Sequence, residues 1–155
     1  MKTESVKEAI DAYSKAVAIY PSYPDPWYNM GVVYYSAGDT MHAIQSYLKT
    51  LEVKPGFTMA AYNLGAIYFN NRKFNSSVIY FKKALESEPG NFNSNYNTGL
   101  SYLLLNEYKN AIEYLDKALK INPADENALR NISIAYYNLG DTATAMQYRT
   151  MAEKR

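Results

Sequence analysis

The chain has 155 residues, with 16 Lys and Arg against 15 Asp and Glu, 17 Tyr and no Cys. This length accommodates one domain with a real core, and the lack of cysteine excludes disulfides, thiolate nucleophiles and cysteine metal sites. The balanced, interspersed charge argues against a nucleic-acid partner held through its phosphates. No apolar run approaches the length of a membrane span, so we expect no membrane insertion and a cytoplasmic location.

A period of 34 residues runs through the chain. A proline, a tyrosine, an asparagine and, with one exception, a glycine recur at this step. In that order the series are Pro21, Pro55, Pro89 and Pro123; Tyr34, Tyr68, Tyr102 and Tyr136; Asn29, Asn63, Asn97 and Asn131; and Gly31, Gly65 and Gly99, with Ser133 in the fourth place. Such a period indicates an array of structurally equivalent units.

The first segment, residues 3–23, matches only the second half of the repeated pattern. Ala9, Tyr13 and Ala16 have the spacing of one helix face, and Pro21 follows the helix. The alanine face lacks the first helix that the other units have. We therefore expect either a piece of a longer array or a lone helix that caps the stack. An uncovered face of this kind also makes a homodimer through the N-terminal helix possible.

Each later unit is predicted to fold as helix, turn, helix and loop. In the first of these units, Trp27, Met30 and Tyr34 lie on one helical face. We expect Asp25 to cap this helix, and Gly38 to mark the turn before a second helix. The units span residues 24–57, 58–91, 92–125 and 126–155, and with residues 3–23 they form a single domain over residues 1–155.

The last unit differs from the others. Asp125 is expected to cap its first helix, and Gly140 to mark its turn. Ser133 replaces the glycine, and Arg149 stands where the pattern places an aromatic residue. A polar outer face is what a terminal unit of a repeat array requires, so we expect the array to end near Arg155.

These residues resemble the tetratricopeptide repeats, whose pattern W-x2-L-G-x2-Y, then A-x3-F, then P, appears here as Trp27, Met30, Gly31, Tyr34, Ala43, Tyr47 and Pro55. The resemblance implies an all-α fold, a tetratricopeptide-repeat α-solenoid that winds as a right-handed superhelix of antiparallel helix pairs with a concave groove. We expect the glycine and alanine columns to let two backbones approach closely, and the aromatic columns to fill the spaces between units.

The asparagine row is the main candidate binding site. A side-chain amide offers donors and an acceptor, so a row of them can bind the backbone of an extended peptide. The row resembles the asparagine ladder of the repeat region in O-linked N-acetylglucosamine transferases; the alternative is that asparagine is only a common exposed residue of such repeats. The predicted groove residues are Asn29, Asn63, Asn97, Asn131, Tyr28, Tyr62, Tyr96, Arg130, Tyr35, Phe69, Asn70, Tyr137 and Asn138.

No catalytic constellation is visible in the sequence. His42 is the only histidine, and no cysteine, serine–histidine–acid arrangement, phosphate loop or metal-ligand cluster accompanies it. We therefore expect no catalytic residue, metal or cofactor, and a protein or peptide partner for a non-catalytic interaction scaffold. Two alternatives stay open: a substrate-recruiting or regulatory module of a larger multidomain enzyme such as a glycosyltransferase, and an architectural self-assembly module.

Overall fold

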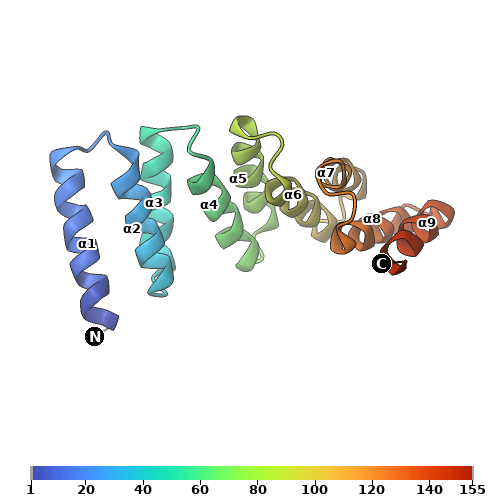
Figure 1. Cartoon of the computed structure of the whole chain (residues 1–155), viewed down its shortest axis with the longest axis horizontal. Helices are drawn as coiled ribbons and strands as arrows, with labels where there is room; N and C mark the ends of the chain where they lie inside the picture. Colours follow the sequence, from blue (N-terminus) through green and yellow to red (C-terminus); the bar gives the residue numbers. More distant parts are fainter. Residues whose placement is uncertain (1, 155) are drawn as a thin grey trace.

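Figure 1 shows the computed structural model of the protein as a row of helices that runs from the N-terminus at one end to the C-terminus at the other. The structure describes residues 2–154, with side chains from Ser5 onward. Helices are the only regular secondary structure in that range. In chain order they are α1 (Lys2–Ile19), α2 (Pro24–Ser36), α3 (Thr40–Val53), α4 (Thr58–Asn70), α5 (Phe74–Ser87), α6 (Phe92–Leu104), α7 (Tyr108–Ile121), α8 (Glu126–Asn138) and α9 (Thr142–Glu153).

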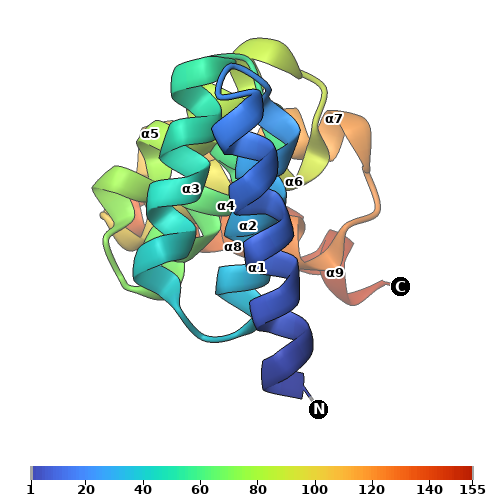
Figure 2. The same cartoon turned by 90° about the vertical axis from the view of Figure 1, so that its left-hand side faces the viewer.

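Neighbouring helices pack in antiparallel pairs: α2 with α3, α4 with α5, α6 with α7, and α8 with α9. Each pair also packs on the next, and α1 packs on α2. The helix axes turn along the row, so that α1 to α3 stand upright while α7 is seen almost end-on (Figure 1), and the later helices lie behind α1 when the row is viewed from its N-terminal end (Figure 2). The predicted all-α solenoid of antiparallel helix pairs is confirmed. None of the helices in the described part of the chain is both long and apolar enough to cross a membrane.

The turns within the helix pairs have a left-handed residue at the same repeat position. Gly38 and Gly140 occupy it with φ values of 83° and 86°, as the Gly-Asp dipeptides predict. In the two middle pairs the position is taken by Arg72 and Asn106, with φ values of 58° and 61°. Glycine adopts this conformation without steric cost, whereas a side chain such as that of arginine is strained by it. Arginine gives no sequence signal for such a turn, whereas asparagine adopts the left-handed conformation more readily than most residues.

Side-chain caps begin some of the helices. The prediction for Asp125 is confirmed, because its Oδ1 accepts a hydrogen bond from the Ala128 backbone N–H at 2.8 Å. The prediction for Asp25 is wrong: helix α2 begins at Pro24 after Tyr23, and Asp25 lies inside the first turn. Proline suits the first turn because it lacks the N–H that would otherwise need a partner there. An aspartate also caps α3 and α9.

The glycine column makes room for side chains of the second helix. A Cβ atom on Gly31 would lie 2.5 Å from the Tyr47 ring, and one on Gly65 would lie 2.6 Å from the Phe81 ring. The absent Cβ therefore makes room for a large side chain of the second helix. At Gly99 the nearest atoms also include backbone atoms of α7, the Ala111 carbonyl oxygen and the Leu115 nitrogen, both at 3.1 Å. The predicted close backbone approach is therefore seen directly at Gly99.

Helix α1 leaves its alanine face uncovered. In α3 the equivalent face is fully packed against α2, with Ala43 and Tyr47 only 0% and 1% exposed. In α1 the corresponding Ala9 and Tyr13 are half-buried, and Ala12 is exposed. The difference arises because no first helix lies against this face of α1 in the described chain.

Candidate functional site

The asparagine row on the first helices is hydrogen-bonded from one helix pair to the next. In each case the side-chain amide donates to the hydroxyl of a tyrosine on the preceding first helix. These three inter-repeat pairs, with their nitrogen–oxygen distances, are Asn63–Tyr28 (3.4 Å), Asn97–Tyr62 (3.1 Å) and Asn131–Tyr96 (3.0 Å). The structure therefore brings together two sets of predicted groove residues, the asparagines and the tyrosines Tyr28, Tyr62 and Tyr96. The bonds link α2 to α4, α4 to α6 and α6 to α8.

The sequence predicts the asparagine and tyrosine columns as groove residues, but it predicts no hydrogen bond between them. Each tyrosine precedes its asparagine by 35 residues, a constant offset that could have signalled the contact. An offset of 35 residues is one more than the repeat length of 34. It indicates a contact only when successive first helices lie side by side, because the two side chains then face each other across the boundary. The asparagines are consequently part of the inter-repeat packing as well as of the surface.

Two phenols at these interfaces have perturbed acidity. Burial raises the pKa of Tyr96, nearby Asp125 raises it further, and the hydrogen bond from Asn131 acts in the opposite direction. Burial raises the pKa of Tyr47, which packs on Tyr28, to about 12, against the opposing effect of the Asn63 amide. Both phenols are therefore protonated at neutral pH.

The inter-repeat pairs retain hydrogen-bonding capacity. An asparagine amide has two N–H donors and a carbonyl acceptor, and a tyrosine hydroxyl has one donor and one acceptor. Asn97 and Asn131 each use one N–H on their tyrosine. In the first pair the Tyr28 hydroxyl also donates to Met59 Sδ, at 3.8 Å. Each of the other two pairs thus offers a carbonyl oxygen, an N–H and an O–H to a ligand.

The predicted groove residues near the ends of the first helices, Tyr35, Phe69, Asn70, Tyr137 and Asn138, are arranged less regularly. Asn70 repeats the pairing, since its amide lies 3.4 Å from Tyr35 Oη. Phe69 packs edge-on against Phe74, with ring centres 5.5 Å apart. Asn138 instead donates to the Ile134 backbone carbonyl of its own helix, at 2.8 Å. Tyr137 is 66% exposed. The structure therefore joins only Tyr35 and Asn70 among these predicted residues.

Charged side chains lie near the two ends of the asparagine row. Asn29 begins the row, half-buried on α2 and near the exposed Asp25. At the other end, Arg130 stands in the tyrosine column and forms an ion pair with Glu126. Between these ends, the asparagine row and the tyrosine column contain no charged residue. This surface is therefore suited to an uncharged ligand and offers few groups that could attract a strongly charged one.

Another tyrosine column lies inside the helix pairs. Tyr68, Tyr102 and Tyr136 each pack on a tyrosine of the following helix, with ring centres 5.3, 5.7 and 5.6 Å apart. In the first pair a serine replaces that second tyrosine, and His42 stacks on Tyr34 instead, at 5.0 Å. The His42 Nδ1 atom also lies 2.6 Å from Asp39 Oδ2. The only histidine thus contributes to packing and capping, a role that the sequence analysis missed.

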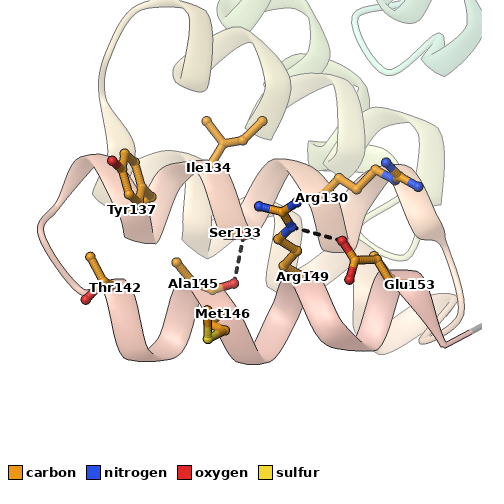
Figure 3. Close-up of a pocket in the computed structure, with 10 residues that line it drawn as sticks. Arg130, Ser133, Ile134, Tyr137, Thr142, Ala145, Met146, Arg149 and Glu153 are labelled. Carbon is orange, nitrogen blue, oxygen red and sulfur yellow. Dashed lines mark hydrogen bonds and ion pairs between the residues drawn. The ribbon is translucent and has the colours of Figure 1, made fainter.

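A cavity of about 550 Å³ opens between α8 and α9, and we call it the end cavity (Figure 3). Two of the predicted groove residues, Arg130 and Tyr137, line it from opposite ends. Ser133 does not act there as a spacer like the glycines, because its hydroxyl donates to the Ala145 backbone carbonyl at 2.7 Å. Arg149 also lines the cavity, and its Nε donates to Glu153 Oε1 at 2.9 Å.

Family models for tetratricopeptide repeats match most of the chain. A model described as tetratricopeptide repeat matches residues 24–57 and 60–91, a second matches residues 93–125, and a model described as TPR repeat matches residues 1–38. The chain is therefore built of tetratricopeptide repeats. No curated protein is a significant match to it.

Solved structures of MamA have a similar fold. One crystal structure of MamA is 25% identical, with a TM-score of 0.85 over 98% of this chain and 89% of that one. A second is also 25% identical, with a TM-score of 0.86 over 98% and 83% of the two chains. MamA from Desulfovibrio magneticus RS-1 is 22% identical, with a TM-score of 0.81 over 97% and 85%. Together with the repeat matches, this similarity indicates a protein-interaction scaffold.

Proposed function

We propose that this tetratricopeptide-repeat solenoid is a non-catalytic scaffold that binds a peptide segment of a partner protein in a concave groove along its first helices. The observation that carries the proposal is the series of inter-repeat pairs, which presents amide and hydroxyl groups at each step of the array. The carbonyl and N–H that Asn97 and Asn131 retain are complementary to the N–H and carbonyl of a peptide unit. A ligand backbone in extended conformation supplies such groups at regular intervals.

The proposed ligand segment is uncharged and carries apolar or aromatic anchors. Charged side chains are confined to the ends of the row, and apolar side chains project beside the amides. Val32, Tyr35 and Ile134 are 40%, 45% and 48% exposed. Tyrosine is effective in such contacts because it combines a large apolar surface with a polar tip. In this proposal the amides bind the ligand backbone and the exposed apolar side chains select its side chains.

A peptide selection followed by point variants tests this function. Peptides selected from a random library on the wild-type chain would be measured against a variant with Asn63→Ala, Asn97→Ala and Asn131→Ala. We expect at least about tenfold weaker binding by this variant, since each amide contributes roughly 0.5–1.5 kcal/mol. The matched control is Asn75→Ala with Asn110→Ala, which removes exposed amides from the second helices α5 and α7 and should leave binding unchanged. Equal affinity for wild type and the triple asparagine variant would refute the proposed ligand-binding role of the asparagine row.

A second candidate function is self-assembly through α1. The observation that favours it is the uncovered face of Ala9, Ala12 and Tyr13, whose equivalents in α3 are fully packed. Two copies of this chain could cover these faces with each other in a symmetric contact. Light scattering of the wild type and of Ala12→Glu tests it, with Ser14→Glu as an exposed control on the same helix. A wild-type monomer at every concentration would exclude the homodimer.

A further inference from the structure

The end cavity has the same place in the last helix pair as a filled site in the pair before it. Each residue that lines the cavity has an equivalent 34 residues earlier in the chain, and these equivalents lie on α6 and α7. There the equivalent residues include Leu103, Ile112 and Leu115, which pack in one hydrophobic cluster with residues of α8. Helix α8 thus fills the earlier site, and no helix fills the later one in the described chain.

The residues that α8 supplies define the shape of the missing occupant. They are Ala128, Ile132 and Ala135, at positions i, i+4 and i+7 of one helix face, and each is fully buried. The two small alanines on either side of the larger Ile132 let α8 pack closely against α6 and α7. In the end cavity the corresponding walls remain apolar but are uncovered. Tyr137 and Met146 are 66% and 70% exposed, and Ala145 and Ala152 form the floor between them.

The charged end of the cavity adds a requirement on the occupant. Arg130 and Arg149 replace Tyr96 and Leu115 of the preceding pair, and Figure 3 shows both at the end opposite Tyr137. In the filled site, the N-terminal half of α8 lies against Tyr96, because the Asn131 amide donates to the Tyr96 hydroxyl at 3.0 Å. A helix placed one repeat further along would bring its own first turn to Arg130. The cavity therefore has basic side chains where an acidic first turn would lie.

Carboxylates of this chain also face that end. Glu126 pairs with Arg130, and Glu153 pairs with Arg149. Both ion pairs are exposed and lie within single helices, so they are weak and can rearrange when another carboxylate approaches. The two arginines can then be shared between their own glutamates and an incoming acidic residue.

We propose that the end cavity binds an amphipathic helix of a partner protein, with an acidic first turn, alanine-sized residues at i and i+7 and a larger apolar residue at i+4. The helix would lie on α8 and α9 as α8 lies on α6 and α7. Its acidic first turn would contact Arg130 and Arg149, and its apolar residues would cover Tyr137, Met146 and the alanine floor. This site shares Ile134 with the surface of the peptide-binding proposal, but it uses none of the inter-repeat pairs and does not depend on that proposal.

A synthetic peptide tests the proposal directly. The probe is a labelled peptide with the sequence of residues 124–139, which contains α8 and its acidic cap. Fluorescence anisotropy with the whole chain is expected to show saturable one-to-one binding. The Met146→Glu variant should weaken binding by roughly tenfold or more, because it places a charge against the apolar face of the peptide. Met41→Glu is the matched control: Met41 is 64% exposed, on α3, away from the cavity.

A second peptide isolates the charge contribution. It carries Asp125→Asn and Glu126→Gln and should bind wild type several-fold more weakly than the first peptide. This difference should disappear in the Arg130→Gln variant. Absence of saturable binding, or equal weakening by Met41→Glu and Met146→Glu, would overturn the proposal. So would a wild-type dimer that Met146→Glu dissociates, because the occupant would then be a second copy of this chain.

Discussion

The Asn97 side-chain amide donates a hydrogen bond to Tyr62 Oη at 3.1 Å, across the boundary between two helix pairs. Both side chains are partly buried, so the bond is shielded from competing water. Its equivalents occur at the two other boundaries between first helices. Asn63, Asn97 and Asn131 therefore contribute to the stability of the array and also form part of the proposed binding surface.

Removal of the Tyr62 hydroxyl should destabilise the array without disturbing its packing. We expect Tyr62→Phe to lower the free energy of unfolding by about 0.5–1.5 kcal/mol, because the Asn97 amide loses a partner. Urea unfolding followed by circular dichroism measures the change. Tyr35→Phe is the control, since its bond to Asn70 is exposed and longer, at 3.4 Å. An equal loss in both variants would show that burial does not strengthen the inter-repeat bond.

A methyl group at Gly65 should clash with the core. The new Cβ would lie 2.6 Å from the buried Phe81 ring, and such overpacking costs typically about 1–3 kcal/mol. Gly65→Ala should therefore lower the thermal midpoint, and it should cost less in a Phe81→Ala background, because the ring that the new Cβ meets is then absent. A double-mutant cycle measures this coupling. Gly90→Ala is the control, because nothing lies within 4 Å of its Cβ position.

Ser94 is a site where removal of a polar atom should stabilise the protein. Its Oγ is buried without a hydrogen-bond partner among the described residues. The equivalent residues Ala60 and Ala128 are alanines. Ser94→Ala should raise the free energy of unfolding by about 1–3 kcal/mol, the cost of a buried unsatisfied polar group. Ser101→Ala should have the opposite effect, because its hydroxyl bonds to Ser77 at 3.0 Å. A decrease in stability for Ser94→Ala would contradict the assignment of an unpartnered hydroxyl.

The α9 cap should make stability dependent on pH in the acid range. The backbone N–H of Thr144 donates to the Asp141 carboxylate and holds its pKa below the ordinary value of 3.8. A group whose folded pKa is depressed stabilises the fold above its unfolded pKa, and this contribution disappears as pH falls through the folded pKa. The thermal midpoint of wild type should thus fall more steeply below pH 4 than that of Asp141→Asn. Asparagine keeps the cap but does not titrate in this range. Parallel curves would refute this contribution of Asp141.

The repeat period made the fold predictable from the sequence. The recurrence of Pro21, Tyr34 and Asn29 at one step required equivalent units, and the apolar spacing within each unit required helices. Local chemistry also determined the turns at Gly38 and Gly140 and the cap at Asp125. It did not determine the left-handed conformation of Arg72, because the repeat geometry overrides the preference of that residue.

The role of each surface residue depended on contacts between neighbouring units. The sequence alone determined which residues recur, and therefore that Asn63, Asn97 and Asn131 form a row on the first helices. Only the tertiary structure decided that each of them bonds to a tyrosine of the preceding unit, because that contact depends on how far successive helices are offset. Only the tertiary structure also decided that the site between α8 and α9 is open, because a site is open or filled according to which helix lies beside it.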